Sequence, residues 1–234
     1  MSAENYKSVA NKLKFEGRAY INGKYVDAID GEKFENINPA TGDVLCSVAK
    51  CNHKDVDLAV KVSRKAFESG VWSKTAPEYR KEILLKFAEL LRKHGVENSI
   101  LECVDTGKLI NDCLNEVAND TPMHFQWYAE LIDKTFGKVS ATDPSITSLI
   151  VKEPIGVVAA VVPWNFPLMM AVWKAAPALA AGCSVIIKPA EDTPLSALRI
   201  AQIASEAGIP DGVFNVLPGF GDVGEALGRH NDVD

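Results

Sequence analysis

Three short apolar runs recur at nearly equal intervals in the last third of the chain, and they constrain the fold more than any other feature. They cover residues 157–162, 184–187 and 213–217, so their first residues lie 27 and 29 positions apart. A continuous apolar run is typical of a strand buried on both faces, and this interval matches one strand–helix–strand unit. Pro194 and Gly208 bracket a predicted helix between the last two runs. The pattern predicts an α/β fold with a right-handed, doubly wound parallel sheet.

Residues before this region predict further strands and helices. Asn22-Gly23 between two apolar segments predicts a β-hairpin over 18–26, because this dipeptide adopts the positive φ angles of a type I′ turn. Thr75 and Glu78 have the spacing of a capping box and predict the start of a helix. Other strands are expected over 34–38 and 44–49, and other helices over 55–68 and 111–133.

The segment 137–153 differs from its surroundings, because two extended stretches flank a polar loop. A projecting hairpin presents unpaired strand edges, which often pair with another subunit. The alternative is a solvent-exposed flap, which is the commoner fate of a polar loop. The residues alone favour the flap and leave subunit pairing open.

Composition excludes several classes of protein. The net charge of −6 argues against nucleic acid or an anionic membrane as the main partner. No apolar run reaches the length of a membrane span, and the polar first 15 residues lack a signal-peptide core. Five cysteines without a CxxC pair fit reduced thiols, and four scattered histidines give no support for a metal site. The expected location is therefore the cytoplasm.

Polar residues follow each of the three apolar runs, at the edge where ligands of such sheets bind. Asn165 follows the first run, where a lone asparagine most often caps the next helix. Lys188 and Glu191 follow the second; they could form a solvated ion pair or hold the ribose hydroxyls of a dinucleotide, with Glu191 repelling a 2′-phosphate. The third run leads into G-x-G-x-x-G over 219–224, whose backbone could approach a pyrophosphate or simply make a tight turn.

Several longer strings occur in order along the chain from about residue 18 onward, namely 38–42, 105–108, 161–168, 173–183, 187–191 and 206–216. Through these strings the chain resembles the aldehyde dehydrogenase superfamily. Within that superfamily, the segments 127–130, 132–134 and 229–232 most resemble the γ-glutamyl-γ-aminobutyraldehyde dehydrogenases.

The resemblance implies a role for particular residues. Asn165 matches the family's oxyanion-hole asparagine, whose side-chain N–H stabilises charge that develops during the reaction. The hairpin over 137–153 matches the family's oligomerisation strands, which implies a homo-oligomer when full length. The implied substrate is an aldehyde, in particular an aminoaldehyde, and the implied cofactor is NAD. The positions implied to bind the cofactor are Val161, Val162, Pro163, Trp164, Lys188, Glu191 and Gly221, and those implied to line the aldehyde tunnel are Phe166, Met169 and Trp173.

The chain departs from the family pattern in two respects. Only Asp222 and Val223 separate Gly221 from Gly224, where relatives have three residues, and one residue turns a helix by about 100°. The placement of Gly224 is therefore open. The family's general-base glutamate and nucleophilic cysteine lie beyond residue 234, and Cys183 is expected to be a packed thiol.

We therefore expect a truncated chain that supplies the cofactor-binding half of the enzyme and does not oxidise aldehydes alone. A non-catalytic fragment that binds nucleotide or associates with subunits is one alternative. An unrelated NAD-binding oxidoreductase built on the glycine turn is another. The expected organisation is a polar leader over 1–17, strands and helices of the cofactor domain over 18–136, the oligomerisation hairpin over 137–153 and the first βαβ units of a Rossmann-like fold over 154–234.

Overall fold

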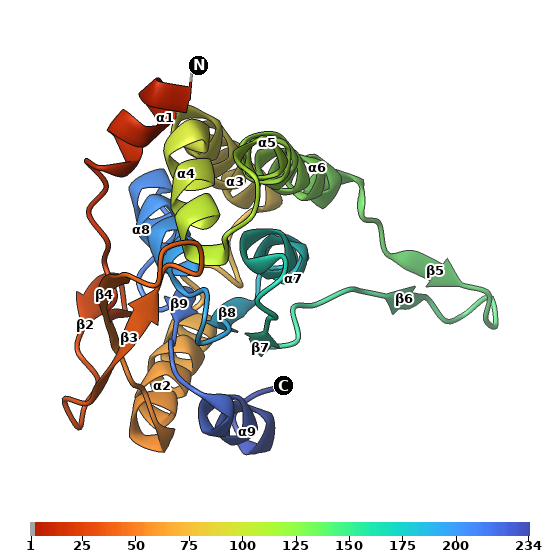
Figure 1. Ribbon diagram of the computed structural model, residues 1–234. Coiled ribbons are helices and arrows are strands. Elements are labelled where there is room, and N and C mark those ends of the chain that lie inside the picture. Colours follow the sequence, from red (N-terminus) through yellow and green to blue (C-terminus); the bar gives the residue numbers. More distant parts are fainter. Residues whose placement is uncertain (1–2) are drawn as a thin grey trace.

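The computed structural model describes residues 3–234, and its centre is a five-stranded sheet with the order β2-β1-β9-β8-β7 (Figure 1). The three predicted apolar runs form β7 (Val157–Val161), β8 (Ser184–Lys188) and β9 (Phe214–Val216), which are parallel. β1 (Ala19–Ile21) and β2 (Lys24–Val26) continue the sheet beyond β9 in the antiparallel sense.

The α/β fold and the predicted parallel strands are thus confirmed, and the hairpin β1–β2 makes the whole sheet mixed. The reason lies in the predicted turn between β1 and β2. Asn22 and Gly23 have φ angles of 54° and 77°. A two-residue turn of this kind joins only antiparallel neighbours.

Helices cover both faces of the sheet, as a doubly wound fold requires. α7 (Pro167–Ala181) and α8 (Leu195–Ala207) follow β7 and β8 and pack on one face. α2 (His53–Ser69) and α9 (Gly221–Arg229) pack on the other. Residues of β8 alternate between the faces: Ile187 belongs to the first cluster and Ile186 to the second.

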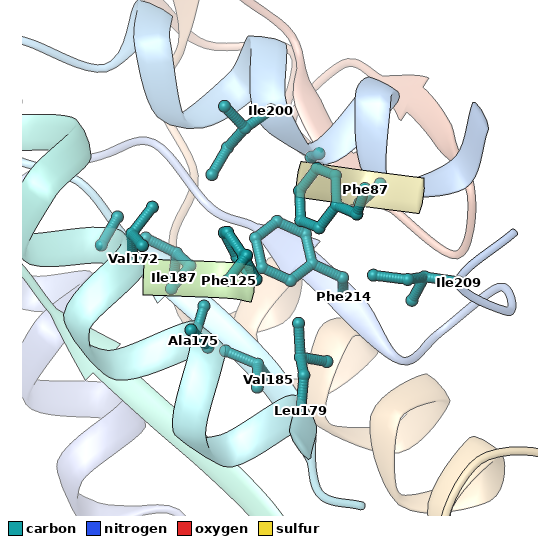
Figure 2. Packing of buried hydrophobic residues seen from close by; sticks show 14 of the residues in the cluster. Phe87, Phe125, Val172, Ala175, Leu179, Val185, Ile187, Ile200, Ile209 and Phe214 are labelled. Carbon is teal, nitrogen blue, oxygen red and sulfur yellow. The ribbon is translucent and has the colours of Figure 1, made fainter. Parts of the chain in front are cut away.

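A second helical layer covers α7 and α8. It consists of α3 (Pro77–Lys93), α4 (Gly95–Thr106) and α6 (Thr121–Leu131). Phe87 of α3 and Phe125 of α6 meet with ring centroids 4.5 Å apart, and both side chains are fully buried. Figure 2 shows these rings among aliphatic residues of α7 and the sheet, including Val172, Ala175 and Ile187. Burying one such ring stabilises the fold by roughly 1.5–3 kcal/mol.

The helices outside the sheet differ from the sequence predictions in several places. The capping box is wrong: α3 has Ala76 as its N-cap without a side-chain bond, and the Thr75 hydroxyl instead donates to Trp72 O at 2.7 Å. The helix predicted over 111–133 is interrupted by a π-helical segment. The four parts are α5 (Ile110–Cys113), η1 (Leu114–Asp120), α6 and the 3-10 turn η2 (Ile132–Lys134).

The N-terminal segment and α4 carry structure that the sequence did not predict. Within the segment expected to be a polar leader, α1 (Ala3–Ala10) is helical and packs against α4, while residues 1–2 lie outside the described part. α4 itself had no counterpart in the prediction.

Two hairpins complete the chain. The strands predicted over 34–38 and 44–49 are present as β3 (Lys33–Ile37) and β4 (Val44–Ala49), and they pair with each other. β5 (Lys138–Ser140) and β6 (Ser148–Ile150) form the predicted second hairpin, which projects away from the body (Figure 1). Within residues 3–234 no helix is both long and apolar enough to cross a bilayer, and no cluster of metal-ligating side chains is found.

Candidate cofactor and aldehyde site

The carboxyl ends of the three parallel strands meet at one edge of the sheet. Val161 pairs with Lys188 in register, and Val162 N donates to Lys188 O at 3.0 Å beyond the end of β7. A cleft of about 530 Å³ lies at this edge. Its walls include one residue from the segment after each strand, namely Trp164, Glu191 and Phe220. The structure therefore brings together the three strand ends that the sequence singled out.

Lys188 and Glu191 are not a solvated surface pair. Lys188 is 3% exposed, and its Nζ lies 3.0 Å from the Glu191 carboxylate, which is itself partly exposed. Burial opposes ionisation of Glu191, but hydrogen bonds from its own backbone and from Lys188 outweigh that effect and hold its pKa below the ordinary value. A buried ammonium beside a partly exposed carboxylate can present a donor and an acceptor to two vicinal hydroxyls.

Asn165 does not cap α7. The helix begins at Pro167 with Phe166 as its N-cap, and no side-chain bond is made there. Asn165 is exposed, and its side chain takes part in none of the hydrogen bonds of the described residues. The amide is thus free to donate to a ligand. Its neighbours Val161, Pro163 and Trp164 are exposed as well, whereas Val162 is buried beneath them.

The glycine turn after β9 places the start of α9 against the end of β7. Gly219 has a φ of 153°, and an added Cβ would meet Val223 Cγ2 at 2.7 Å, so only glycine fits this turn. Gly221, the first residue of α9, faces open space. Gly224 lies in the helix, where a Cβ would come within 3.6 Å of Val161. Gly224 therefore packs beside the end of β7 despite the shorter spacing.

Two buried carboxylates on α4 hold the backbone of the site. The N-termini of α7 and α8 lack caps from their own side chains. Glu102 accepts the Leu168 N–H at 3.2 Å, and Asp105 accepts the Leu195 N–H at 3.0 Å and the Asn36 amide at 2.9 Å. Side chains of α4 thus cap the N-termini of α7 and α8 and position the loops after β7 and β8.

Burial sets the ionisation of both carboxyl groups. It raises the pKa of Glu102 and the pKa of Asp105 to about 7 each, although the hydrogen bonds that they accept act in the opposite direction. Glu102 Oε1 has no hydrogen-bond partner among the described residues. The folded protein is therefore destabilised less by a protonated Glu102 than by an ionised one.

The predicted tunnel residues fall into two groups. Phe166 and Trp173 are about half exposed, whereas Met169 is buried. Trp173 lies beside His124 of α6, with ring centroids 5.9 Å apart. The Nζ of Lys108 lies 4.0 Å from the centroid of the Phe166 ring.

Sequence reasoning assigned no role to Glu102, Asp105 and Lys108, although Asp105 and Lys108 lie in the motif 105–108 that marks the family resemblance. Cys183 is buried at the amino end of β8, the end of the strand opposite to Lys188. The length of β8 separates this thiol from Asn165.

Comparisons with known proteins agree with this geometry. The family model described as the aldehyde dehydrogenase family matches residues 25–234. The chain is 49% identical over its whole length to an aminoacetaldehyde dehydrogenase of Pseudomonas aeruginosa, covering 47% of that protein. It is 47% identical over 98% of its length to the NADP/NAD-dependent aldehyde dehydrogenase PuuC of Escherichia coli, covering 46% of it.

A solved structure is equally similar. The crystal structure of γ-glutamyl-γ-aminobutyraldehyde dehydrogenase from Burkholderia cenocepacia matches with a TM-score of 0.98 and 48% identity, over all of this chain and 48% of the other. The chain thus spans about half the length of the curated relatives it matches. The matched region includes β7–β9 and every residue of the strand-end cleft. The chain belongs to the aldehyde dehydrogenase family.

Proposed function

We propose that this chain forms the NAD-binding part of an enzyme that oxidises an aldehyde, in particular an aminoaldehyde, to its carboxylic acid. The observation that carries the proposal is the convergence of a free Asn165 amide and the Lys188–Glu191 pair at one edge of the sheet. NAD supplies a hydride acceptor when bound. The similarity to an aminoacetaldehyde dehydrogenase and to PuuC supports both the reaction and the cofactor.

One group of residues binds the cofactor and another binds the aldehyde. Lys188 donates to a ribose hydroxyl and Glu191 accepts from one, while the Glu191 charge disfavours a 2′-phosphate and so favours NAD over NADP. The other cofactor contacts are the backbone over 161–164 and the start of α9 at Gly221. Asn165 donates its N–H to the aldehyde oxygen as negative charge develops there. Phe166, Met169 and Trp173 line the path of the aldehyde.

The 234 residues by themselves are proposed to be catalytically inactive. No thiol lies among the described residues of the cleft, and Cys183 is buried at the far end of β8. Without a nucleophilic thiolate, no covalent adduct forms that could release hydride. The alternative, a nucleotide-binding or subunit-associating polypeptide without catalysis, is favoured by the same observation.

The hairpin β5–β6 supports a homo-oligomer. Val139 and Leu149 face each other across the two strands and are 73% and 63% exposed. Apolar side chains on a projecting hairpin are the usual mark of a partner surface. We propose a cytoplasmic homo-oligomer in which this hairpin contacts a second copy.

The test compares the 234-residue chain with the complete polypeptide encoded by the reading frame that contains it. NADH formation from an aldehyde is followed by absorbance for both. We expect turnover by the complete polypeptide and none by the 234 residues. Turnover by the short chain contradicts the assignment of chemistry to another segment, and absence of turnover by the complete polypeptide contradicts the proposed reaction.

A further inference from the structure

A second charged pair lies next to the proposed aldehyde site. Lys108 follows the end of α4, and its Nζ lies 4.0 Å above the ring of Phe166, the neighbour of Asn165. The same ammonium forms an ion pair with Glu116 of η1. Both side chains of this pair are only 20% exposed. The Lys108 ammonium group is thus partly withdrawn from solvent, and it contacts the residue that follows the proposed oxyanion donor Asn165.

The backbone fixes this position of Lys108. Gly107 ends α4 in the left-handed conformation, with a φ of 73°, and so turns the chain at this point. Lys108 N donates to Thr106 Oγ1 at 3.2 Å, and Lys108 O accepts from the Cys103 thiol at 3.1 Å. The side chain therefore leaves an anchored backbone.

Glu116 and the Phe166 ring together form a cation-binding pair. A carboxylate neutralises an ammonium, and the face of an aromatic ring attracts it. In water such an interaction is weak, but it strengthens when both partners are partly withdrawn from solvent. The Lys108 ammonium group already occupies the position between Glu116 and the Phe166 ring. The Glu116 carboxylate is therefore paired and is not available to bind the ammonium group of a substrate.

We propose that Lys108 sets the charge preference of the aldehyde site within the aminoaldehyde class, so that a free ammonium group close to the carbonyl lowers kcat/KM relative to a nitrogen masked as an amide or to an uncharged isostere. This inference rests on the proposed function, which places the aldehyde beside Asn165 and Phe166. Lys108 is a specificity-determining residue in this account and takes no part in the reaction.

The experiment uses the complete polypeptide and two isosteric substrates, butanal and 3-aminopropanal. The quantity measured is the kcat/KM for 3-aminopropanal divided by that for butanal. In Lys108→Met the site keeps Glu116 and Phe166 free for the substrate ammonium, so we expect the ratio to rise about tenfold. In Glu116→Gln the Lys108 charge loses its counter-ion, and the ratio falls.

Control variants separate charge from structure. Lys108→Arg keeps the charge and leaves the ratio close to that of the wild type. Lys81→Met removes a lysine from a comparable pair with Asp133 elsewhere on the surface, and the ratio is unchanged. The Lys108→Met/Glu116→Gln double variant lies between the two single variants.

The outcomes distinguish the inference from the function on which it rests. A ratio that stays at the wild-type value in Lys108→Met, or one that rises in Glu116→Gln, overturns the inference while butanal turnover upholds the function. Should Lys108→Met fail to fold, the direction of the change in Glu116→Gln decides. Absence of wild-type turnover with butanal overturns both.

Discussion

The edge of the sheet where the site lies and the hairpin β5–β6 are built in opposite ways. At the sheet edge, Glu102 and Asp105 are buried and bind the backbone of the first turns of α7 and α8. In the hairpin, every side chain from 136 to 147 is exposed, and the Asp143 carboxylate accepts hydrogen bonds from Ser145, two residues away. The first region is held by long-range contacts and the second by local ones.

This difference shows what each region requires. A dinucleotide site requires backbone and side chains held in place before the ligand arrives, because ordering them during binding weakens affinity. A projecting apolar hairpin is stabilised little by contacts with its own chain, and its side chains become buried only against a partner. Substitutions of the same kind are therefore expected to have very different effects on stability in the two regions.

The largest contrast is expected between Phe87→Ala and Leu149→Ala. Phe87 is fully buried against Phe125, so its removal leaves a cavity and lowers the free energy of unfolding by about 3–5 kcal/mol. Leu149 is exposed within one copy of the chain, so its removal changes the free energy of unfolding of the monomeric chain by about 0.5 kcal/mol or less. Chemical denaturation measures both; equal losses would contradict the contrast.

The next contrast concerns pH. Burial raises the pKa of Glu102 to about 7 from an ordinary value of 4.5, so between these values the folded state holds more protons than the unfolded state. Stability therefore falls as pH rises through this window, by up to about 3 kcal/mol for this group. Glu102→Gln cannot ionise and should flatten the dependence of the unfolding free energy on pH between about 4.5 and 7. An unchanged slope in this variant would show that Glu102 is ionised in the folded state.

The third contrast compares two aspartates. Asp105→Ala leaves the Leu195 N–H unpaired in a buried place and removes one of the two hydrogen bonds of the Asn36 amide, which costs about 1–3 kcal/mol. Asp143→Ala removes only exposed bonds to Ser145 and should change stability by less than about 0.5 kcal/mol. Thermal denaturation of both variants at one pH makes the comparison, and a milder effect at Asp105 than at Asp143 would refute it.

The sequence predicted the parts of the fold that depend on local patterns. The strands β7–β9 were recognisable because their apolar runs are continuous, and the β1–β2 turn because Asn22-Gly23 has few other conformations. The polar residues at the strand ends followed from the parallel topology. All of these signals lie within a few residues of the element that they specify.

α4 was not predicted because its sequence lacks the apolar pattern that usually marks a buried helix face. Four polar residues (Asn98, Ser99, Glu102 and Asp105) occupy buried positions of this helix, so the apolar stripe of an ordinary amphipathic helix is broken. The backbone partners of Glu102 and Asp105, which are Leu168 and Leu195, lie more than 60 residues away. A helix cap from a residue so far away in the sequence produces no local sequence pattern. The ion pair of Lys108 with Glu116 has no characteristic sequence pattern either.

The central claim is that the carboxyl ends of β7, β8 and β9 bind NAD through the Lys188–Glu191 pair. The most direct test is a calorimetric titration of the complete polypeptide with NAD, repeated with Lys188→Met. This variant removes a buried charged donor at the proposed ribose site and should weaken binding by about tenfold or more, since a hydrogen bond to a charged group contributes about 1.5–3 kcal/mol and 1.4 kcal/mol is about tenfold. Equal affinity of the two proteins for NAD would contradict the claim.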